Sequence, residues 1–574
     1  MNTIMKNVSR AGLCVAAVLL AAACSDTWDD HYDTVAEYDY DGTTLEYLAN
    51  QSELSDFYKI VVATGFDDEL SSSQVLTIFA PQNGTFNYDS LVALIDAGNT
   101  TGVLERFVEN HVTRYNISIG SSEQEVTLLN EKIVDVGTLS TLLVGDVSVA
   151  NANISCSNGV LQELDGYLPY RYNIYEQLEV LNDEYIAANG ESDSLVSLYN
   201  FLLKYDEEEL DEDQSVARGL DEDGNTVYVD SVTIHNNDVL TDLDAYLFRE
   251  DSTYILIYPS VEAYQERVAL DAEYFNLNYL YSSDEAVRDS MQEYYANYYA
   301  MTNLLFNMND NQHDTDSLFS TSYNRNNWEY NVFYNPYSSG GILDPSTIQQ
   351  EIECSNGTIY VVDQYPYSIY DAFYQKIEVE GEETRYLVTD ESYVTASTTT
   401  TTYSNSADSI SNGRYMYIST TASGQTKLAY YLPNTLSGSY DIYIKTLPQS
   451  VRVTDSATIA SSLPARYQFT YYERNSSGEW PSSGTQLQNP EDGTRYFVFD
   501  AFNIDTVYIG TIDFTSSFYN TDAGVMLMLQ SYVLTSQRNT YTKELYLDCI
   551  ILEPTKESEA TDEEDEEEED DAEE

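Results

Sequence analysis

The sequence predicts an α+β protein in which two copies of a mixed module precede an all-β sandwich. The duplication is visible in two near copies, Ile154–Tyr170 and Ile352–Tyr367, which read I-S-C-S-N-G-V-L-Q-E-L-D-G-Y-L-P-Y and I-E-C-S-N-G-T-I-Y-V-V-D-Q-Y-P-Y. A repeat of such long period indicates one structural unit used twice. Beyond residue 371, helical periodicity gives way to short strand-like runs separated by Gly, Pro, Ser and Asn, which favours a β-sandwich.

These observations divide the chain into six segments. We predict a signal peptide over residues 1–23, an acidic tether over 24–35, a first module over 36–172, a second over 173–370, a β-sandwich over 371–555 and an acidic tail over 556–574. The tail is expected to be disordered because an unbroken run of carboxylates repels itself.

The charge balance excludes one class of partner. The chain has 97 acidic and 25 basic residues and a formal charge of −72. Binding to nucleic acid depends on Lys and Arg that neutralise phosphates, so we expect no nucleic-acid partner. The 53 tyrosines suit strand faces, wet interfaces and stacking on sugar rings, and composition does not separate these uses.

The N-terminus carries the pattern of a secretory signal. Lys6 and Arg10 precede an apolar run, Ala11–Ala23, that is too short to cross a bilayer. Leu20–Cys24 (L-A-A-A-C) resembles a bacterial lipobox, which implies cleavage before Cys24 and acylation of that cysteine. The alternative is an ordinary cleavage site beside an incidental cysteine. Apart from this lipid, the sequence predicts no cofactor.

Acidic residues follow the predicted lipid site directly. Asp26, Asp29 and Asp30 resemble the export signal of surface lipoproteins in bacteria that feed through Sus-like outer-membrane systems. The resemblance implies a place on the extracellular face of the outer membrane, with the periplasmic face as the alternative. It also implies SusC/SusD-like transporter proteins and other surface lipoproteins as partners.

The first module shows a mixed order of elements. Apolar residues at helical spacing predict helices over Thr43–Ala49, Leu54–Thr64, Ser90–Ala97 and Val103–His111. Leu76–Phe86 predicts a buried strand that Pro81 ends, with Asn83-Gly84 as a turn. Further strands are predicted over Glu125–Leu129, Lys132–Val136 and Leu142–Ala150.

Three motifs of this module resemble the fasciclin (FAS1) domain. They are Thr77–Asn83 (T-I-F-A-P-Q-N), Val108–Val112 (V-E-N-H-V) and the Asn158-Gly159 pair with Asp165. Asn110 stands where the family usually has Tyr. The resemblance implies a small β-sandwich or wedge with packed helices, a role in adhesion or protein contacts, and no catalytic constellation.

The second module mirrors the first. Tyr254–Tyr264 places Pro259 where Pro81 stood, and Cys354–Gly357 repeats the closing motif. Helices are predicted from Asn173, over Ser194–Leu203 and over Met291–Asn307, and Asp223-Gly224 predicts a hairpin turn. No histidine stands where His111 would map, so this FAS1-like copy departs further from the family.

The C-terminal region resembles a jelly-roll, galactose-binding-like module. Eight strands are predicted: Arg414–Ser419, Lys427–Leu432, Ser439–Thr446, Tyr467–Tyr472, Arg495–Phe499, Thr506–Ile512, Val525–Leu534 and Glu544–Leu552. The Thr398–Thr402 run is expected to be a surface loop or linker. Because such sandwiches host many functions, function does not follow from the fold.

The sequence offers no motif for catalysis or for a metal held by Cys and His. It lacks nucleophile, phosphate-loop and dinucleotide signatures, so no enzyme is expected. A hydrolase that works with two carboxylates stays open as a third hypothesis. Asp221–Asn225 and Asn309–Asp316 are oxygen-rich calcium candidates without EF-hand spacing, and turns explain both equally well. His111 is expected to be a bonded core residue.

Exposed aromatic residues are the candidate glycan contacts. These are Trp328 and Trp480, with Tyr471 and Tyr472 beside the latter. The alternative for Trp480 is a loop tryptophan folded back on its own domain. The hypothesis is therefore a non-catalytic surface lipoprotein, an accessory subunit of a SusC/SusD-like complex that takes up glycan or peptide. A free-standing adhesin or glycan-binding protein is the alternative.

Overall fold

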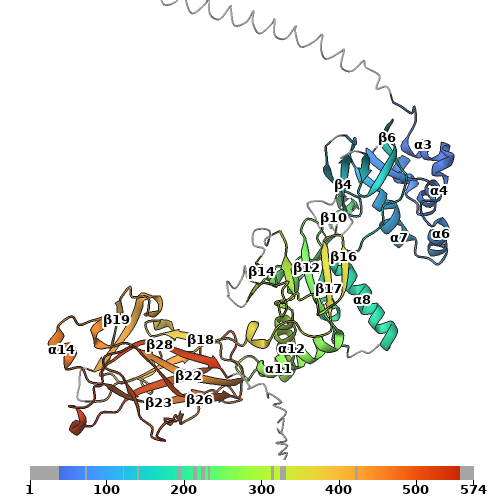
Figure 1. Ribbon diagram of the computed structural model, residues 1–574. Helices are drawn as coiled ribbons and strands as arrows, with labels where there is room; N and C mark the ends of the chain where they lie inside the picture. Colours follow the sequence, from blue (N-terminus) through green and yellow to red (C-terminus); the bar gives the residue numbers. More distant parts are fainter. Residues whose placement is uncertain are drawn as a thin grey trace, which may run out of the picture. The chain divides into compact units, whose positions relative to one another are not determined.

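A computed structural model describes residues 38–71, 74–120, 122–138, 141–190, 195–210, 216–220, 226–230, 233–309, 311, 316–322, 331–420 and 424–555. The chain divides after Tyr172 into two compact units, Met1–Tyr172 and Asn173–Glu574 (Figure 1). Cys24, Trp328, the turn at Asp223-Gly224 and the acidic tail lie outside the described residues. None of the helices within the described ranges combines the length and hydrophobicity that crossing a bilayer requires.

The first unit packs helices against a seven-stranded sheet in the order β2-β1-β7-β6-β5-β4-β3 (Figure 1). Its helices are α3 (Thr44–Asn50), α4 (Ser55–Ala63), α5 (Asp67–Ser71), α6 (Tyr88–Asp96) and α7 (Thr100–Val103), and α7 continues through the π-helical turn η2 (Leu104–Val108) and the 3₁₀ turn η3 (Glu109–His111). Its strands are β1 (Leu76–Pro81), β2 (Val112–Arg114), β3 (Gln124–Thr127), β4 (Ile133–Thr138), β5 (Leu142–Val144), β6 (Val147–Cys156) and β7 (Gly159–Leu164). The strand predicted over Leu142–Ala150 is two strands, because Gly145 adopts a left-handed conformation with φ +54° between them.

Strand β1 lies at the centre of the first unit and is buried along its whole length. Ile78 belongs to the core formed with the helices, whereas Phe79 belongs to a second core formed with the β3–β5 strands. β1 runs parallel to β7 in a register that pairs Leu76 with Gly159 and Pro81 with Leu164. A strand buried on both faces explains why T-I-F-A lacks a polar alternation.

The second unit begins with a module that repeats this arrangement. Its sheet has the order β13-β12-β17-β16, and β12 runs parallel to β17 with Tyr254 opposite Gly357 and Pro259 opposite Val362. The helices are α8 (Ile174–Asn189), α9 (Leu198–Leu203), α10 (Asp238–Asp242), α11 (Val261–Tyr274) and α12 (Glu285–Met301). The strands of the sheet are β12 (Tyr254–Pro259), β13 (Leu305–Asn307), β16 (Ile348–Cys354) and β17 (Gly357–Val362).

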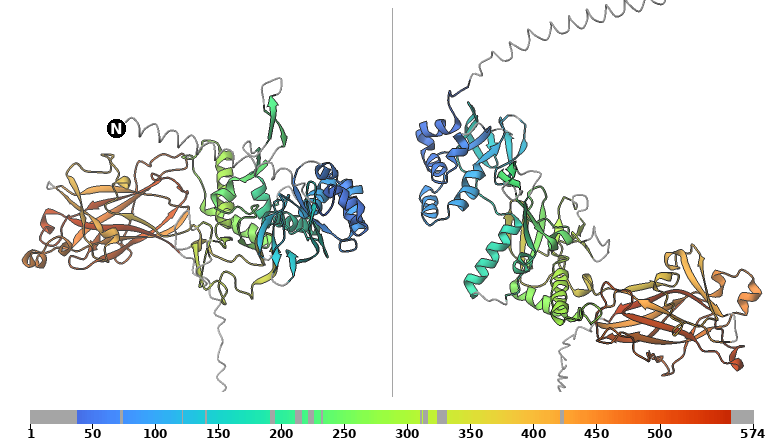
Figure 2. Two further views of the ribbon diagram at one scale, coloured as in Figure 1. Left: turned by 90° about the horizontal axis from the view of Figure 1, so that it is seen from above. Right: turned by 180° about the vertical axis from the view of Figure 1, so that it is seen from behind.

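One helix of this module ends earlier than predicted, whereas the antiparallel strands on either side of Asp223-Gly224 agree with the predicted hairpin. The helix expected over Met291–Asn307 ends at Met301, and the apolar residues after it form β13, which pairs with β12. Between α9 and α10 the chain adds two ribbons, and the one made by β9 and β10 projects away from the sheet (Figure 2). The ribbons and the small β14–β15 pair are formed by β8 (Asp206–Leu210), β9 (Val216–Leu220), β10 (Thr226–Asp230), β11 (Thr233–Asn237), β14 (Ser317–Phe319) and β15 (Val332–Tyr334).

The rest of the second unit is a sandwich of two sheets. One has the order β19-β20-β28-β22-β26 with β18 also paired to β28, and the other has the order β21-β27-β23-β24 with β25 paired to β23. The strands are β18 (Ile377–Glu380), β19 (Thr398–Ser404), β20 (Arg414–Thr420), β21 (Lys427–Leu432), β22 (Gly438–Thr446), β23 (Ala465–Glu473), β24 (Thr485–Gln486), β25 (Phe497–Phe499), β26 (Asp505–Phe514), β27 (Val525–Ser531) and β28 (Leu545–Pro554). A short helix, α14 (Ser456–Ala460), was not predicted. The threonine run expected to be a loop is β19, an edge strand paired with β20 over its whole length.

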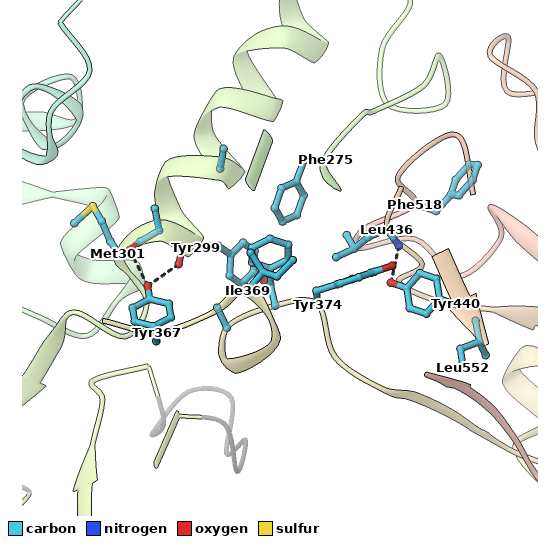
Figure 3. Close-up of a cluster of buried hydrophobic side chains, with 14 of the residues drawn as sticks. Phe275, Tyr299, Met301, Tyr367, Ile369, Tyr374, Leu436, Tyr440, Phe518 and Leu552 are labelled. Atoms are coloured by element: carbon cyan, nitrogen blue, oxygen red, sulfur yellow. Dashed lines mark hydrogen bonds between the residues drawn. The ribbon is translucent and has the colours of Figure 1, made fainter. Parts of the chain in front are cut away.

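The second module and the sandwich share one continuous hydrophobic core. Phe275, in the connection between α11 and α12, stacks on Tyr299 with ring centroids 5.4 Å apart and meets Tyr519 of the sandwich edge-on at 5.8 Å. Tyr374 lies against Tyr440 of β22 at 5.1 Å (Figure 3). Backbone bonds reinforce the contact, since the N–H of Ser517 donates to the carbonyl of Asn276 at 2.8 Å.

Candidate glycan-binding surface

The sheet that contains β21, β27 and β23 has one face toward the core of the sandwich and one face toward solvent. Alternation along β23 sends Tyr467 and Phe469 into the core and places Gln468, Thr470 and Tyr472 on the other face. We call this second face the outer face. Its strand positions are Lys427, Ala429, Tyr431, Arg466, Gln468, Thr470, Tyr472, Met526, Met528 and Gln530.

The register of the three strands arranges the outer face in rows. Tyr431, Met526 and Tyr472 face one another across one end. Ala429, Met528 and Thr470 form the next row, and Lys427, Gln530 and Gln468 form a third.

A last pair, Arg466 and Tyr532, ends the outer face, where the N–H of Tyr532 donates to the carbonyl of Arg466 at 2.9 Å. Tyr472 lies six positions after Arg466 along β23, so the face is about 20 Å long. The polar side chains Lys427, Gln530, Gln468 and Thr470 are half-buried rather than covered. A ligand can reach these polar side chains, whereas Ala429, Met526 and Met528 beside them are buried.

One end of the outer face is an aromatic cluster, composed of Tyr393, Tyr431, Tyr472 and Trp480 above the buried methionines of β27. Trp480 lies nearly parallel to Tyr431, at 20° and 6.2 Å between centroids. Tyr393 meets Tyr472 edge-on at 5.1 Å. All four rings are half-buried, so each keeps part of its surface in solvent.

Trp480 is positioned by a tight loop and by one arginine. The side-chain oxygen of Asn475 accepts the backbone N–H groups of Ser477 at 3.0 Å and Glu479 at 2.9 Å, which closes the loop before the tryptophan. The guanidinium carbon of Arg474 lies 4.4 Å from the Trp480 ring, and its Nε donates to the carbonyl of Ala523 at 2.7 Å. Trp480 is thus packed on its own sheet and contributes an edge of the surface rather than a free-standing platform.

The opposite end of the outer face is an arginine–tyrosine cluster. Tyr496 and Tyr532 lie with centroids 4.8 Å apart. The guanidinium carbon of Arg495 is 5.3 Å from the Tyr496 ring and 5.1 Å from the Tyr532 ring, and that of Arg466 is 4.9 Å from Tyr496. Arg466 is 8% exposed, and its Nε donates to the carbonyl of Tyr532 at 2.8 Å, whereas Arg495 is exposed.

The structure unites some predicted contacts and separates others. Trp480 and Tyr472 share the aromatic cluster, but Tyr471 packs against the core on the other face because neighbouring strand residues point in opposite directions. Trp328 lies outside the described residues. Sequence reasoning missed the amide row, formed by Gln468 and Gln530, and the arginines Arg466 and Arg495. These residues come from three separate segments that only the tertiary fold brings together.

Most residues of the calcium candidates lie outside the described part of the chain, whereas His111 lies within it. Asp221–Asn225 lies outside the described residues, as does most of Asn309–Asp316, and the described residues contain no group of three His, Cys, Asp or Glu side chains arranged to hold a metal ion. His111 is confirmed as a core residue, fully buried, with Nδ1 2.7 Å from the carbonyl of Phe107 and Nε2 accepting the N–H of Leu168 at 2.9 Å. Burial raises the pKa of the Cys156 thiol to about 11 and that of Cys549 to about 12, so neither is a nucleophile.

The third hypothesis, a hydrolase that works with two carboxylates, directs attention to a pocket at one end of the sandwich. It measures about 250 Å³ and is lined by hydroxyl-bearing and apolar side chains together with Asp500 and Glu544. Backbone N–H groups of Phe502 and Asn503 bind Asp500 at 2.6 and 2.9 Å and hold the pKa of that carboxyl below its usual range. Asp500 therefore anchors its loop and is unsuited to donate a proton.

Comparisons with known proteins identify the first domain. Residues 52–169 match the family model of the Fasciclin domain, so this domain is a fasciclin domain. No curated protein matches the chain. A FAS1 domain pair from the insect cell adhesion molecule Fasciclin I is similar at 13% identity over 56% of this chain and 98% of that chain, with a TM-score of 0.20.

Other similar structures match about a third of the chain. They include the CBM22-1 xylan-binding domain from Paenibacillus barcinonensis Xyn10C, at 11% identity over 32% of this chain and 95% of that chain with a TM-score of 0.21. A family 35 carbohydrate binding module from Clostridium thermocellum matches at 8% identity over 32% of this chain and 99% of that chain, with a TM-score of 0.18. A Paenibacillus xanthan lyase matches at 15% identity over 35% of this chain, with a TM-score of 0.20, and this chain spans only 16% of its length.

Proposed function

We propose that the protein is a non-catalytic glycan-binding or adhesive protein of the cell surface and that the outer face of its sandwich holds the ligand. The observation that carries this proposal is the order of side chains on that face: aromatic rings at one end, amides and a threonine in the middle and arginines with tyrosines at the other. Aromatic rings offer flat apolar surfaces to sugar rings, and amides offer both donors and acceptors to hydroxyl groups. The fasciclin domain supports the adhesive side of the proposal.

Binding is tested on the soluble protein that begins at Ser25, by affinity electrophoresis in gels that contain single polysaccharides. We expect retardation by at least one polysaccharide. Trp480→Ala and Tyr472→Ala should each weaken that binding about tenfold, because each removes a ring from the aromatic cluster. Tyr115→Ala, which removes a tyrosine that is 75% exposed on the first domain, is the matched control and should bind as the parent does. If no polysaccharide retards the parent protein relative to a gel without polysaccharide, the result argues against the proposal.

The lipid anchor at Cys24 is the part of the proposal that concerns location. Each buried acyl methylene contributes about 0.8 kcal/mol, so several long chains would hold the protein on the outer membrane. Cys24→Ala should abolish incorporation of a labelled fatty acid and release the protein from membranes. Protease added to intact cells should digest the parent protein if it faces outward and spare it if it faces the periplasm.

A finer proposal is association with a SusC/SusD-like transporter. In that role the anchor would raise the effective concentration of a weak binding surface for glycan or peptide at the transporter mouth. A tagged protein should co-purify with the transporter pair in mild detergent. Recovery as a monomer without companions would favour the free-standing adhesin.

A further inference from the structure

The charge of the outer face differs from the charge of the chain. Acidic residues outnumber basic ones by 97 to 25 over the whole sequence. The strand positions of the outer face include Lys427 and Arg466 and no Asp or Glu. Arg474 and Arg495 add a positive charge at each end. The face is therefore a positive strip on a strongly negative protein.

Two of these cations stand together without an acidic partner. Arg466 and Arg495 both contact the Tyr496 ring, with guanidinium carbons 4.9 and 5.3 Å from its centroid. None of the ion pairs found among the described residues includes either arginine. An anion bound beside this ring would be attracted by both charges. The bond from Arg495 Nε to the Tyr496 hydroxyl also lowers the pKa of that phenol.

The geometry fits one kind of anion. A guanidinium group binds a planar carboxylate through two parallel hydrogen bonds. Arg495 is exposed and its Nε already donates to the Tyr496 hydroxyl, so such a contact would use its two Nη groups. Tyr532 and Tyr496 offer ring surfaces beside that fork. The neighbouring row of Gln468, Gln530 and Lys427 continues the strip with hydrogen-bonding groups.

We infer that the outer face recognises polysaccharides that contain uronic acids, with a sugar carboxylate bound at Arg495. This inference rests on the proposed glycan-binding function and names its ligand class. Along the rest of the strip the amide row would hold sugar hydroxyl groups, and the aromatic cluster would contact a sugar ring at the far end.

The experiment compares each uronate polysaccharide with its carboxyl-reduced form, which keeps the linkages and loses the charge. Binding of the Ser25–Glu574 protein is measured by affinity electrophoresis and calorimetry in 0.15 M salt, with a sulfated polysaccharide as a third ligand. Arg495→Gln is the test variant. Arg452→Gln is the matched control, because Arg452 is also exposed and stacks on a tyrosine, Tyr417 at 4.3 Å, but on the other sheet.

We expect the uronate form to bind and its reduced form to bind at least tenfold more weakly. Arg495→Gln should lose about tenfold in affinity for the uronate form and nothing for neutral glycans, while Arg452→Gln should match the parent. Arg495→Lys, which keeps the charge and loses the fork, should fall between the two. The unfolding temperature should be the same for all variants, since the substituted side chains are exposed.

Other results would overturn the inference, and they separate its failure from that of the proposed function. Equal binding of the uronate and reduced forms, with no effect of Arg495→Gln, removes the carboxylate subsite and leaves a neutral glycan-binding protein. Equal losses in the Arg495 and Arg452 variants indicate diffuse charge attraction. Preference for the sulfated ligand assigns the site to another anion. Binding to no glycan, with capture of an acidic protein surface instead, removes both proposals.

Discussion

The side-chain oxygens of Asn158 and Asn356 accept equivalent backbone hydrogen bonds, from the N–H of Thr44 at 2.8 Å and from that of Ile174 at 2.9 Å. Each donor is the first residue of a helix, and each asparagine also donates to a backbone carbonyl, that of Leu70 or Leu247. The repeated asparagine therefore joins the end of the sheet to the first helix in both modules.

Replacing either asparagine should destabilise its own unit. Asn158→Ala leaves a buried N–H and a buried carbonyl without their bonds, which should cost about 3 kcal/mol. Asn356→Ala should also be costly, because it removes the bonds to Ile174 and Leu247 and the bond to the carbonyl of Arg249 at 2.9 Å. Calorimetric unfolding of each variant measures the loss, and Asn151→Ala, at an exposed position of β6, should stay within about 0.5 kcal/mol of the parent.

The glycine after each asparagine should tolerate no side chain. A Cβ at Gly159 would lie 2.1 Å from the carbonyl oxygen of Leu76, and one at Gly357 would lie 1.9 Å from that of Tyr254. Gly159→Ala and Gly357→Ala must therefore separate the parallel strand pairs, with a loss above about 4 kcal/mol or failure to fold. Gly120→Ala, where a Cβ would meet nothing within 4 Å, is the control. A soluble Gly159→Ala protein with the parent unfolding temperature would contradict the register.

The first unit should lose stability in mild acid through His111. Burial lowers the pKa of His111 from 6.5 to about 4. Protonation would make Nε2 a donor, and it would then face the N–H of Leu168, which is also a donor. Because the folded pKa lies below the unfolded one, the stabilisation is complete above pH 6.5. It is lost as the pH falls toward 4, by about 3 kcal/mol in total.

Unfolding of the parent and of His111→Gln at a series of pH values separates this effect from that of the carboxylates. The variant should be less stable at pH 7 and should show a flatter dependence between pH 6.5 and 4. Parallel curves for the two proteins would show that another group carries the dependence.

The second module and the sandwich should unfold together. Phe275 is fully buried between Tyr299 and Tyr519, so Phe275→Ala should cost about 3–5 kcal/mol. It should also split the calorimetric transition of the second unit or expose the segment between α11 and α12 to protease. Phe502→Ala removes a phenylalanine that is 55% exposed and should change neither property.

Local patterns predicted much of this structure. The Asn-Gly motif, the first buried strand and the clean alternation in β22 depend on neighbours in sequence, and each was assigned to the correct element. The run Leu304–Phe306 fits a helix or a strand equally well by its local pattern. It forms a strand because Leu305 and Phe306 pair with β12. The threonine run became β19 only through contact with β20, a partner that no local signal names.

The candidate surface was harder to predict for the same reason. Trp480 and Tyr472 were found because aromatic residues in a loop and on a strand are visible in the sequence. Gln468 and Gln530 are ordinary residues until the antiparallel register sets them opposite each other. Arg495 gains its role from Tyr532, which comes from another strand end, so its contact is a product of the tertiary fold.

The positive strip on a protein of formal charge −72 implies unusual association kinetics with a polyanion. At about 0.01 M salt the Debye length is about 30 Å, so an approaching uronate chain is repelled by the whole molecule before it reaches the arginines. At about 0.1 M salt the Debye length falls to about 10 Å, which screens the long-range repulsion. The uronate chain should then associate faster, while the short-range contacts at the positive strip remain. The association rate should therefore pass through a maximum as salt increases, whereas a uniformly basic binding protein would only slow down.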